Sequence, residues 1–323
     1  MTLRPLAAAI ALSLLAAASL AQAPVTSPPV PVPAAPSPAA RVVSSIRNKL
    51  SAADLPSAES ILEVHRAQFG EDGTYLMGLG WLARGALLLG EPDRARAFNA
   101  ELRQRCDARL AAGVKLAEND SLENALGASI EVAAQLLERD RGREPAAAYV
   151  RGELAKFPAP VAFRARLYKR LNLLTLTGAP APEIALEDFV GARPAALAAR
   201  RGMPVLVFVW ARSCGDCKAQ AASLTRVARR HSGEGLEVLP LTRYYEDDSV
   251  RVHEKAMIDS VWAAVYGGIG PASIAVSTVS MERYGGSSTP TFVFVDRKGV
   301  VRRYTPTRLT EAALEREVQA ILN

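Results

Sequence analysis

The stretch VLVFVWARSCGDCK, residues 205–218, joins an apolar run to two cysteines that stand two residues apart. Residues 205–210 form the kind of continuous apolar run found in strands that are covered on both faces of a sheet. Beyond Cys214, apolar residues recur at helical spacing as far as His231. We therefore expect a buried strand, a short turn and a helix that begins at about Cys214.

The position of the cysteine pair at the start of a helix favours redox chemistry. Backbone N–H groups lack partners there and the helix dipole is positive, so a thiolate is favoured over a thiol. Cysteines in such settings have pKa values lowered from ~8.5 to roughly 3.5–7.5. Cys214 is the candidate nucleophile, and Cys217, one turn further and more buried, is the candidate resolving thiol.

A metal site and a purely structural disulfide are the alternatives for this pair. A metal would need two further ligands at workable spacing, but His65, His231 and His253 are scattered and Cys106 belongs to another part of the chain. A disulfide across two residues closes a very small loop and constrains the unfolded chain little. We expect no metal, and no cofactor other than a redox-active Cys214–Cys217 disulfide.

The N-terminus indicates export. Residues 1–23, MTLRPLAAAIALSLLAAASLAQA, combine one cation, an Ala/Leu-rich run and a final small-x-small pattern, so we expect a signal peptide. A retained membrane anchor is the alternative, although the run is shorter than the ~20 residues of a spanning helix. Pro-rich residues 24–40 are expected to be a disordered linker. A periplasmic or other extracytoplasmic location would allow a disulfide to persist.

Composition narrows the class of protein. The chain has 323 residues, of which 49% are hydrophobic, and it contains three cysteines, too few for a disulfide-stapled scaffold. Its formal charge is +6, but cations and anions are interleaved, with no basic stripe that also carries aromatic residues. We therefore expect no nucleic-acid partner.

Residues 41–176 carry a helical pattern throughout, and we expect an all-α helical-hairpin domain of six or seven helices. The apolar faces expected from spacing comprise Ile61, Val64 and Phe69; Leu76, Leu79, Ala83 and Ala86; and Leu122, Leu126, Ile130 and Ala133. The segment WLARGALLLGEPDRARAFNAEL, residues 81–102, weakly resembles a tetratricopeptide unit. Cys106 continues a helical row and is expected to be a buried small apolar residue rather than a third redox thiol. Whether this domain merely packs or binds a protein partner stays open.

Residues 177–323 alternate between strand and helix patterns. After the helix that follows Cys214 we expect a strand near 236–242 and a helix over 248–266 with Met257, Val261 and Val265 facing inward. The segment TPTFVFVDRKGVVRRY, residues 289–304, predicts a β-hairpin with its turn at 297–299, before a last helix over 310–322. This order describes an α/β domain with a mixed sheet flanked by helices.

Two segments of this domain resemble a known family. APEIALEDFVGARPAALAARRGMPVLVFVWARSCGDCK and RYGGSSTPTFVFVDRKGVVRRY are similar to the secreted thioredoxin-like thiol–disulfide proteins of the TlpA and ResA type. The resemblance implies a thioredoxin fold, a surface Trp210 beside the site and a cis peptide bond at Thr289-Pro290. In the family such a proline docks the incoming peptide, so Trp210, Thr289 and Pro290 are the expected substrate-binding residues.

The sequence departs from the family between its cysteines. Many relatives have Pro or Glu-Pro there, whereas this chain has Gly215 and Asp216. The charge of Asp216 opposes a thiolate on Cys214, while Arg212 and Lys218 favour one. These three are the candidate pKa-tuning residues, and the net sign of their effect stays open.

Two further departures concern proton transfer to Cys217. Phe208 stands where thioredoxins carry a buried Asp, and Gln220 stands where many relatives carry Glu. Neither side chain can relay a proton. We therefore expect Cys217 to resolve mixed disulfides more slowly than the second cysteine of a typical thioredoxin.

Together these features predict an exported thiol–disulfide oxidoreductase that exchanges disulfides with client proteins. The resemblance favours the reducing direction, because Thr before the proline is common in the reducing branch of the family. Electrons would come from or go to a separate partner. One alternative is a binding module, in which the helices capture a protein and the thioredoxin-like domain recognises peptides. A thiol peroxidase is a second alternative, against which the C-x-x-C pair argues.

Overall fold

The computed structural model describes residues 37–158 and 160–323. The expected signal peptide and the expected linker as far as residue 36 lie outside these residues. Helix α1 (Pro38–Ser51) already begins within the predicted linker, and the Ser37 hydroxyl caps it by accepting the Ala40 N–H at 3.2 Å. The last residues of that linker are therefore helical, because a serine cap followed by proline in the first turn is a favourable helix start.

Residues 38–175, the helical half, form a series of antiparallel helices. They are α1 (Pro38–Ser51), α2 (Leu55–Phe69), α3 (Gly73–Leu88), α4 (Pro92–Ala111), the short 3-10 turn η1 (Leu116–Glu118), α5 (Asp120–Arg141), α6 (Arg143–Lys156) and α7 (Val161–Thr175). Side chains of Asp54, Asp72 and Asn119 each accept a backbone N–H three residues on, which starts α2, α3 and α5. The helical-hairpin architecture is as the sequence predicts.

The core of the helical half confirms most of the predicted faces and corrects one. Leu76, Leu79, Ala83 and Ala86 of α3 are buried, as is Cys106 of α4. On α2, however, Val64 and Phe69 are 58% and 64% exposed, and the buried face comprises Leu55, Ala58, Leu62 and His65. Two apolar rows compete on this helix, and the row containing Leu62 fits against Gly78 of α3, where a Cβ would lie 2.4 Å from a Leu62 methyl group.

Residues 176–323, the sheet half, carry a six-stranded mixed sheet. Its strands are β1 (Asp188–Gly191), β2 (Val205–Val209), β3 (Glu237–Thr242), β4 (Ser273–Val276), β5 (Thr291–Val295) and β6 (Val301–Thr305), in the order β1-β4-β3-β2-β5-β6. Its helices are η2 (Leu197–Arg200), α8 (Gly215–His231), η3 (Ser232–Glu234), η4 (Asp248–Val250), α9 (Arg251–Val261), the π-helical turn η5 (Trp262–Tyr266), α10 (Thr278–Arg283) and α11 (Glu311–Leu322).

Strand β2 lies at the centre of this sheet, parallel to β3 and antiparallel to β5. The hairpin of β5 and β6 continues the sheet on that side, as predicted. Alternate residues of β2 point to opposite faces: Leu206 and Phe208 pack against α8, α9 and α11, and Val205, Val207 and Val209 pack toward α10. Burial on both faces explains why β2 is apolar throughout. This is a thioredoxin-like α/β fold preceded by a helical half, which confirms the predicted fold class.

The inward face of α9 differs from the prediction. Met257 is exposed, and the buried row comprises Glu254, Ile258, Trp262 and Tyr266. The two rows are one residue apart on the helix, and the row with two large aromatic rings removes more apolar surface from water. Val261 and Val265 are half-buried at the edge of this face.

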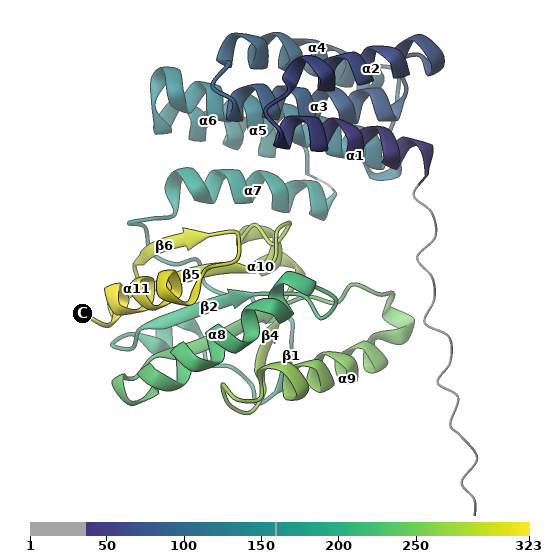
Figure 1. Cartoon of the computed structure of the whole chain (residues 1–323). Coiled ribbons are helices and arrows are strands. Elements are labelled where there is room, and N and C mark those ends of the chain that lie inside the picture. Colours follow the sequence, from purple (N-terminus) through teal and green to yellow (C-terminus); the bar gives the residue numbers. More distant parts are fainter. Residues whose placement is uncertain (1–36, 159) are drawn as a thin grey trace, which may run out of the picture. The chain divides into compact units, whose positions relative to one another are not determined.

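Helix α7 connects the two halves, and Figure 1 shows it between the remaining helices and the sheet. Asn172 donates to the Arg283 carbonyl oxygen of α10 at 2.9 Å, and Arg164 pairs with Glu282 at 2.9 Å. Residues Ser37–Asn323 pack together as one compact unit. The predicted domain boundary between residues 176 and 177 therefore stays a prediction.

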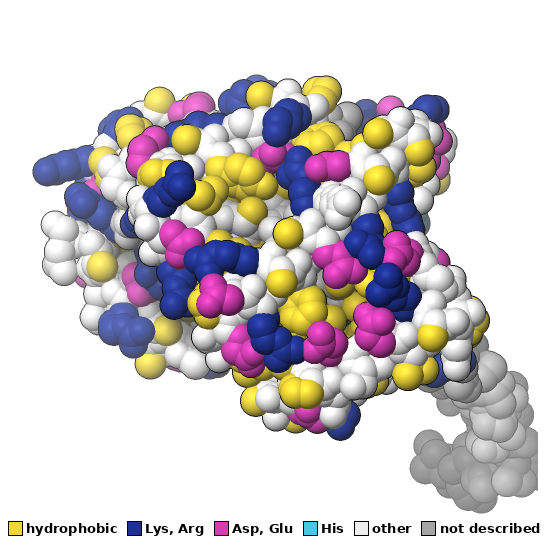
Figure 2. Space-filling model, turned by 90° about the horizontal axis from the view of Figure 1, so that it is seen from above, with side chains coloured by type: hydrophobic (Ala, Val, Ile, Leu, Met, Phe, Trp, Pro, Cys, Tyr) yellow, Lys and Arg dark blue, Asp and Glu magenta, His cyan; other side chains and the backbone are white. Residues whose placement is uncertain are grey.

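Surface charges are mixed. Figure 2 shows Lys and Arg side chains interspersed with Asp and Glu over the face in view, without a continuous field of one sign. In the described part of the chain, no helix combines the length and the apolar character that crossing a bilayer requires.

Candidate active site

Two cysteines joined by a disulfide, Cys214 and Cys217, stand at the N-terminus of α8. Cys214 is the N-cap residue, with extended backbone angles, and its Sγ accepts the Cys217 N–H at 3.0 Å. A sulfur in this position takes the place of the oxygen in an ordinary helix cap. A hydrogen bond to sulfur and the positive end of the helix both favour the thiolate once the disulfide is reduced.

The two sulfurs differ in accessibility. The side chain of Cys217, in the first turn of α8, is fully buried in the core, whereas Cys214 is only partly buried and lines a pocket. This difference agrees with the predicted order, in which Cys214 attacks first and Cys217 resolves. The roles themselves stay predictions.

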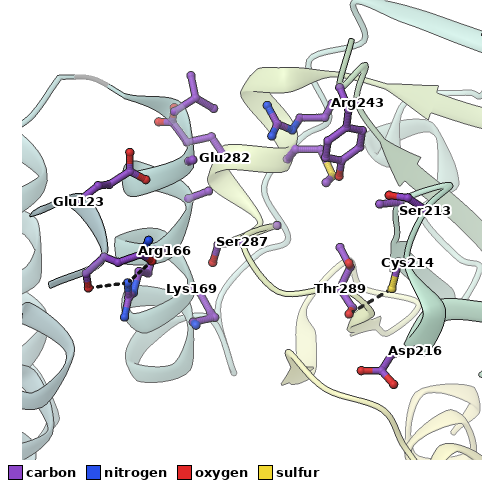
Figure 3. Close-up of a pocket in the computed structure, with 18 of the residues that line it drawn as sticks. Glu123, Arg166, Lys169, Ser213, Cys214, Asp216, Arg243, Glu282, Ser287 and Thr289 are labelled. Atoms are coloured by element: carbon purple, nitrogen blue, oxygen red, sulfur yellow. Dashed lines mark hydrogen bonds between the residues drawn. The ribbon is translucent and has the colours of Figure 1, made fainter. Parts of the chain in front are cut away.

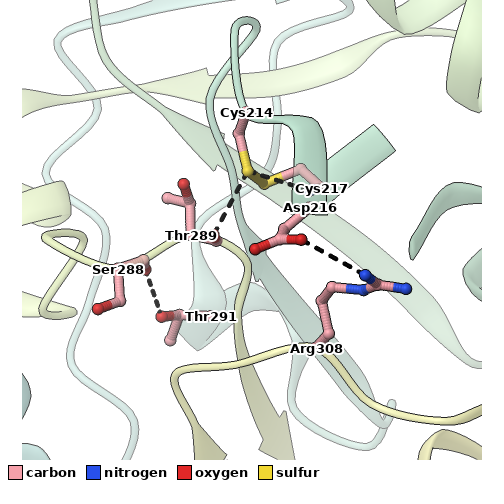
Figure 4. The surroundings of a disulfide bond; sticks show 7 residues. All are labelled: Cys214, Asp216, Cys217, Ser288, Thr289, Thr291 and Arg308. Carbon is pink, nitrogen blue, oxygen red and sulfur yellow. Dashed lines mark hydrogen bonds and ion pairs between the residues drawn. A yellow bond between two sulfur atoms is a disulfide. The ribbon is translucent and has the colours of Figure 1, made fainter. Parts of the chain in front are cut away.

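The loop between α10 and β5 brings Thr289 and Pro290 to the disulfide. The Thr289-Pro290 peptide bond is cis, as the resemblance implies. The Thr289 carbonyl oxygen lies 3.4 Å from the Sγ of Cys214, and Thr291 fixes the loop by donating to the Ser288 carbonyl oxygen at 2.7 Å (Figure 4). The structure thus brings Thr289 to the candidate nucleophile, while its role in substrate binding stays a prediction.

Trp210 is not a surface residue, and the prediction that it flanks the site as exposed surface is wrong. Its side chain is fully buried among Phe208, Trp262 and Tyr266, with ring centroids 5.3–6.5 Å away. The aromatic row of α9 and η5 covers it. The buried row of α9 and η5 lies one residue after the predicted row. Met257 therefore points outward, and Trp262 and Tyr266 point at Trp210.

The three candidate pKa-tuning residues have different surroundings. The Arg212 guanidinium is paired with Glu254 at 3.1 Å and also with Glu246. Asp216 is paired with Arg308 at 3.4 Å, across the disulfide loop (Figure 4). Lys218 is exposed on the first turn of α8. Asp216, which opposes a Cys214 thiolate, and Arg212, which favours one, are thus each paired with an opposite charge.

Glu254 is a residue at this site that the sequence analysis missed. It is 1% exposed, and its carboxylate accepts N–H groups from Tyr245 and Glu246 at 3.0 Å and from Arg212 at 3.1 Å. Burial alone would raise its pKa, but these hydrogen bonds and the Arg212 charge outweigh burial and lower the pKa. A glutamate in the same helical row as Ile258 and Trp262 was the signal that could have identified it.

Phe208 and Gln220 take structural places beside Cys217. Phe208 is fully buried and stacks on Phe292, with centroids 5.4 Å apart. Gln220 is buried, accepts the Leu309 N–H at 2.8 Å and donates to Ser223 at 2.7 Å. Both side chains therefore serve packing and loop attachment rather than proton transfer.

The disulfide opens onto a pocket of about 860 Å³. One wall is formed by Ala211, residues 213–216 and the Thr289 loop, and the opposite wall by α5 and α7 of the helical half (Figure 3). Lys169 of α7 lies 3.4 Å from the Ser288 hydroxyl, next to Thr289. Gly285 makes this approach possible: its φ is +70°, and a Cβ there would lie 2.5 Å from the Lys169 Cα. Sequence spacing gave no signal for this wall, because α7 reaches the site only through tertiary packing.

Within residues 37–158 and 160–323, no group of three or more His, Cys, Asp or Glu residues is arranged to hold a metal ion. What these residues do bring together is a cysteine pair, a backbone carbonyl oxygen and a charged pocket. The chemistry available to this arrangement is disulfide exchange.

No protein-family profile and no curated protein matches the chain. Solved structures resemble part of it. A thioredoxin-family thiol:disulfide interchange protein from Chlorobium tepidum is 17% identical, with 46% of this chain and 97% of that chain covered and a TM-score of 0.34. A secreted disulfide oxidoreductase from Mycobacterium tuberculosis is 19% identical, with 40% and 94% covered and a TM-score of 0.33. An exposed lipoprotein thioredoxin from Streptococcus pneumoniae is 20% identical, with 43% and 99% covered and a TM-score of 0.34. At such identities and scores, the activity of this chain has to be argued from its own site.

Proposed function

We propose that the protein is a thiol–disulfide oxidoreductase that exchanges disulfides with client proteins through Cys214 and Cys217. The observation that carries this proposal is the place of the disulfide: Cys214 caps α8, accepts the Cys217 N–H and lines a pocket, while Cys217 lies beneath it. A structural staple needs no accessible sulfur and no pocket. Exchange needs both.

The exchange runs in two balanced steps in the reducing direction. The Cys214 thiolate attacks one sulfur of a client disulfide, so the client S–S bond breaks, a mixed disulfide forms and the released client thiolate takes up a proton. Cys217 then loses its proton and attacks the Sγ of Cys214, which releases the second client thiolate. The client gains two electrons and the protein is left with the Cys214–Cys217 disulfide. A separate dithiol must reduce this disulfide before the next cycle.

The finer parts of the proposal rest on the sequence. These are membership of the TlpA and ResA type, export to an oxidising compartment and the reducing direction. Reduction potentials in thioredoxin-fold proteins range from about −270 mV for reductants to about −120 mV for oxidants. A reduction potential of about −270 mV for the Cys214–Cys217 pair, measured by alkylation across a dithiothreitol series, would support the reducing direction. A potential of about −120 mV would overturn the reducing direction alone.

The central test is to trap the mixed disulfide. Reduced Cys217→Ser protein is expected to accumulate a covalent adduct with a disulfide-containing client, joined through Cys214 and visible by mass spectrometry. Cys214→Ser is the matched control and is expected to form none. If Cys217→Ser fails to trap an adduct while folding normally, the assignment of Cys214 as nucleophile is wrong. If Cys214→Ser still binds clients and exchange is absent in every form, a binding module becomes the better account.

A further inference from the structure

Three cations of the helical half gather around one carboxylate in the wall opposite Cys214. Arg84 of α3, Arg166 of α7 and Lys169 of α7 contact the carboxylate of Glu131 at 2.8, 3.0 and 3.2 Å. All four side chains line the pocket into which the disulfide opens. Three positive charges against one negative charge leave an excess of +2 at this point.

Two features hold this cluster in place. Arg166 lies across α5 at Gly127, where a Cβ would come within 2.8 Å of the arginine Cδ, and it also donates to the Asn124 carbonyl oxygen at 3.0 Å. Each of the three cations is 15–23% exposed, so they are partly desolvated but open to the pocket. Charges in such a setting act on a ligand more strongly than fully solvated ones.

Two of the three other carboxylates of the pocket are paired with cations from outside this cluster. Glu282 is paired with Arg164 at 2.9 Å and Asp216 with Arg308 at 3.4 Å. Glu123 is the third of these carboxylates, and burial, followed by the neighbouring Asp120, raises its pKa. Figure 3 shows Arg166 and Lys169 on one side of the pocket and Cys214 on the other.

An adjoining recess shares part of the lining of this pocket. A second cavity of about 250 Å³ shares Arg84, Asn124 and Arg166 with the first and adds Met77 and Trp81. The guanidinium groups of Arg47 and Arg84 lie 4.8 and 5.5 Å from the centre of the Trp81 ring. Arg84 and Arg166 therefore border both the pocket that holds Cys214 and the recess that holds Met77 and Trp81.

We propose that the wall formed by α3, α5 and α7 is a subsite for an acidic stretch of the client polypeptide, next to the cysteine that the client's disulfide meets. This inference rests on the proposed function and adds a substrate class to it. Acidic side chains of the client bind Arg84, Arg166 and Lys169, and an apolar residue beyond them enters the Met77 and Trp81 recess. Charge complementarity of this kind accelerates encounter and selects among partners.

The test uses three peptides, each with one cysteine held in a mixed disulfide. They differ only at the two positions that flank this cysteine, which are both Asp in the first peptide, both Asn in the second and both Lys in the third. Rate constants for their reduction by the reduced full chain are each divided by the rate for bis(2-hydroxyethyl) disulfide, a small uncharged reference. We expect the Asp peptide to react about tenfold faster than the Asn peptide at low salt, and the Lys peptide to react slowest. The ratio should fall toward one in 1 M salt, where the Debye length is only about 3 Å.

The variants locate the effect. In Arg84→Gln/Arg166→Gln the Asp-to-Asn ratio is expected to fall about tenfold, to near one, and in Arg166→Lys it should stay high. Arg151→Gln, which removes an exposed cation that pairs with Glu144 on α6, is the matched control and should keep the wild-type ratio. If the cluster only holds the helices together, the double variant will lose thermal stability but keep the ratio, and the inference is then wrong.

The peptide and salt measurements on the unaltered chain decide the matter even if the double variant does not fold. An equal rate for the Asp and Asn peptides, with the small disulfide still reduced, overturns the acidic subsite and leaves the proposed function standing. If neither the small disulfide nor any peptide is reduced, the proposed function fails and the subsite fails with it.

Discussion

Cys106 lies near the end of the twenty-residue helix α4, and Cys214 stands immediately before the first turn of α8. Cys106 is fully buried, and burial, followed by the neighbouring Asp107, raises the pKa of its thiol to about 12. Cys214 borders a pocket and accepts a backbone N–H from its own helix. Both sulfurs belong to helices and both have charged neighbours in sequence. Their place along the helix and their burial separate a packing residue from the candidate nucleophile.

The difference in reactivity between these two thiols is the largest effect that we predict. At pH 7 a thiol with a pKa of about 12 is about 10⁻⁵ ionised, whereas even an unperturbed cysteine is about 3% ionised. Cys214 in the reduced native protein should therefore react with iodoacetamide at least about 10³-fold faster than Cys106. Quenched alkylation followed by peptide mass spectrometry measures both rates in one sample.

Alkylation in denaturant supplies the control, because unfolding should make the two cysteines react at similar rates. Comparable rates for Cys106 and Cys214 in the native state would contradict the comparison. They would also revive the possibility of a third redox thiol in the helical half.

A second, smaller effect concerns the charges near Cys214. Glu254→Gln removes the charge that binds Arg212 and leaves an amide group facing backbone N–H groups, so it should destabilise the protein by about 2–3 kcal/mol at pH 7. Because the pKa of Glu254 is lowered in the folded state, its contribution is fully present above the unfolded pKa of about 4.3. That contribution is lost as the pH falls through the lower folded pKa. Urea unfolding should thus show wild type and variant converging at acidic pH.

Glu246→Gln is the control for this prediction. Glu246 also pairs with Arg212, but it is 52% exposed, and pairs of that kind contribute little to stability. A Glu254→Gln variant as stable as wild type at pH 7, or a difference that persists undiminished at pH 3, would show that the buried carboxylate does not act as described.

Local patterns were sufficient to predict the elements that carry the cysteines. The apolar run of β2, the helical period of α8 and the turn of the β5–β6 hairpin each arise from residues that are close together in the chain. Cys106 was predicted to be buried for the same reason, since it continues one helical row. These features depend on neighbours a few residues away, which a sequence displays directly.

Tertiary packing decided the features that the sequence did not reveal. On α2 and α9 two apolar rows compete, and only the partner helix or sheet selects one, which is why Phe69 and Met257 are exposed. The same selection buries Trp210, against the family resemblance. Arg166 and Lys169 precede Cys214 by about 50 residues in the chain, although all three line the same pocket. No local sequence pattern connects residues so far apart.

The smallest predicted effect is the loss of stability on replacing Cys106. Cys106→Ser replaces a buried thiol by a hydroxyl of similar size, which should destabilise the protein by about 1–2 kcal/mol, because the hydroxyl is desolvated and regains at most a bond to the carbonyl one turn earlier. Ala108→Ser, at an exposed position on the same helix, should change the free energy of unfolding by less than about 0.5 kcal/mol. Urea denaturation compares the two, and reduction of bis(2-hydroxyethyl) disulfide by Cys106→Ser should proceed at the wild-type rate. A loss of exchange in a folded Cys106→Ser protein would mean that the thiol of the helical half takes part in the chemistry, and that burial alone does not silence it.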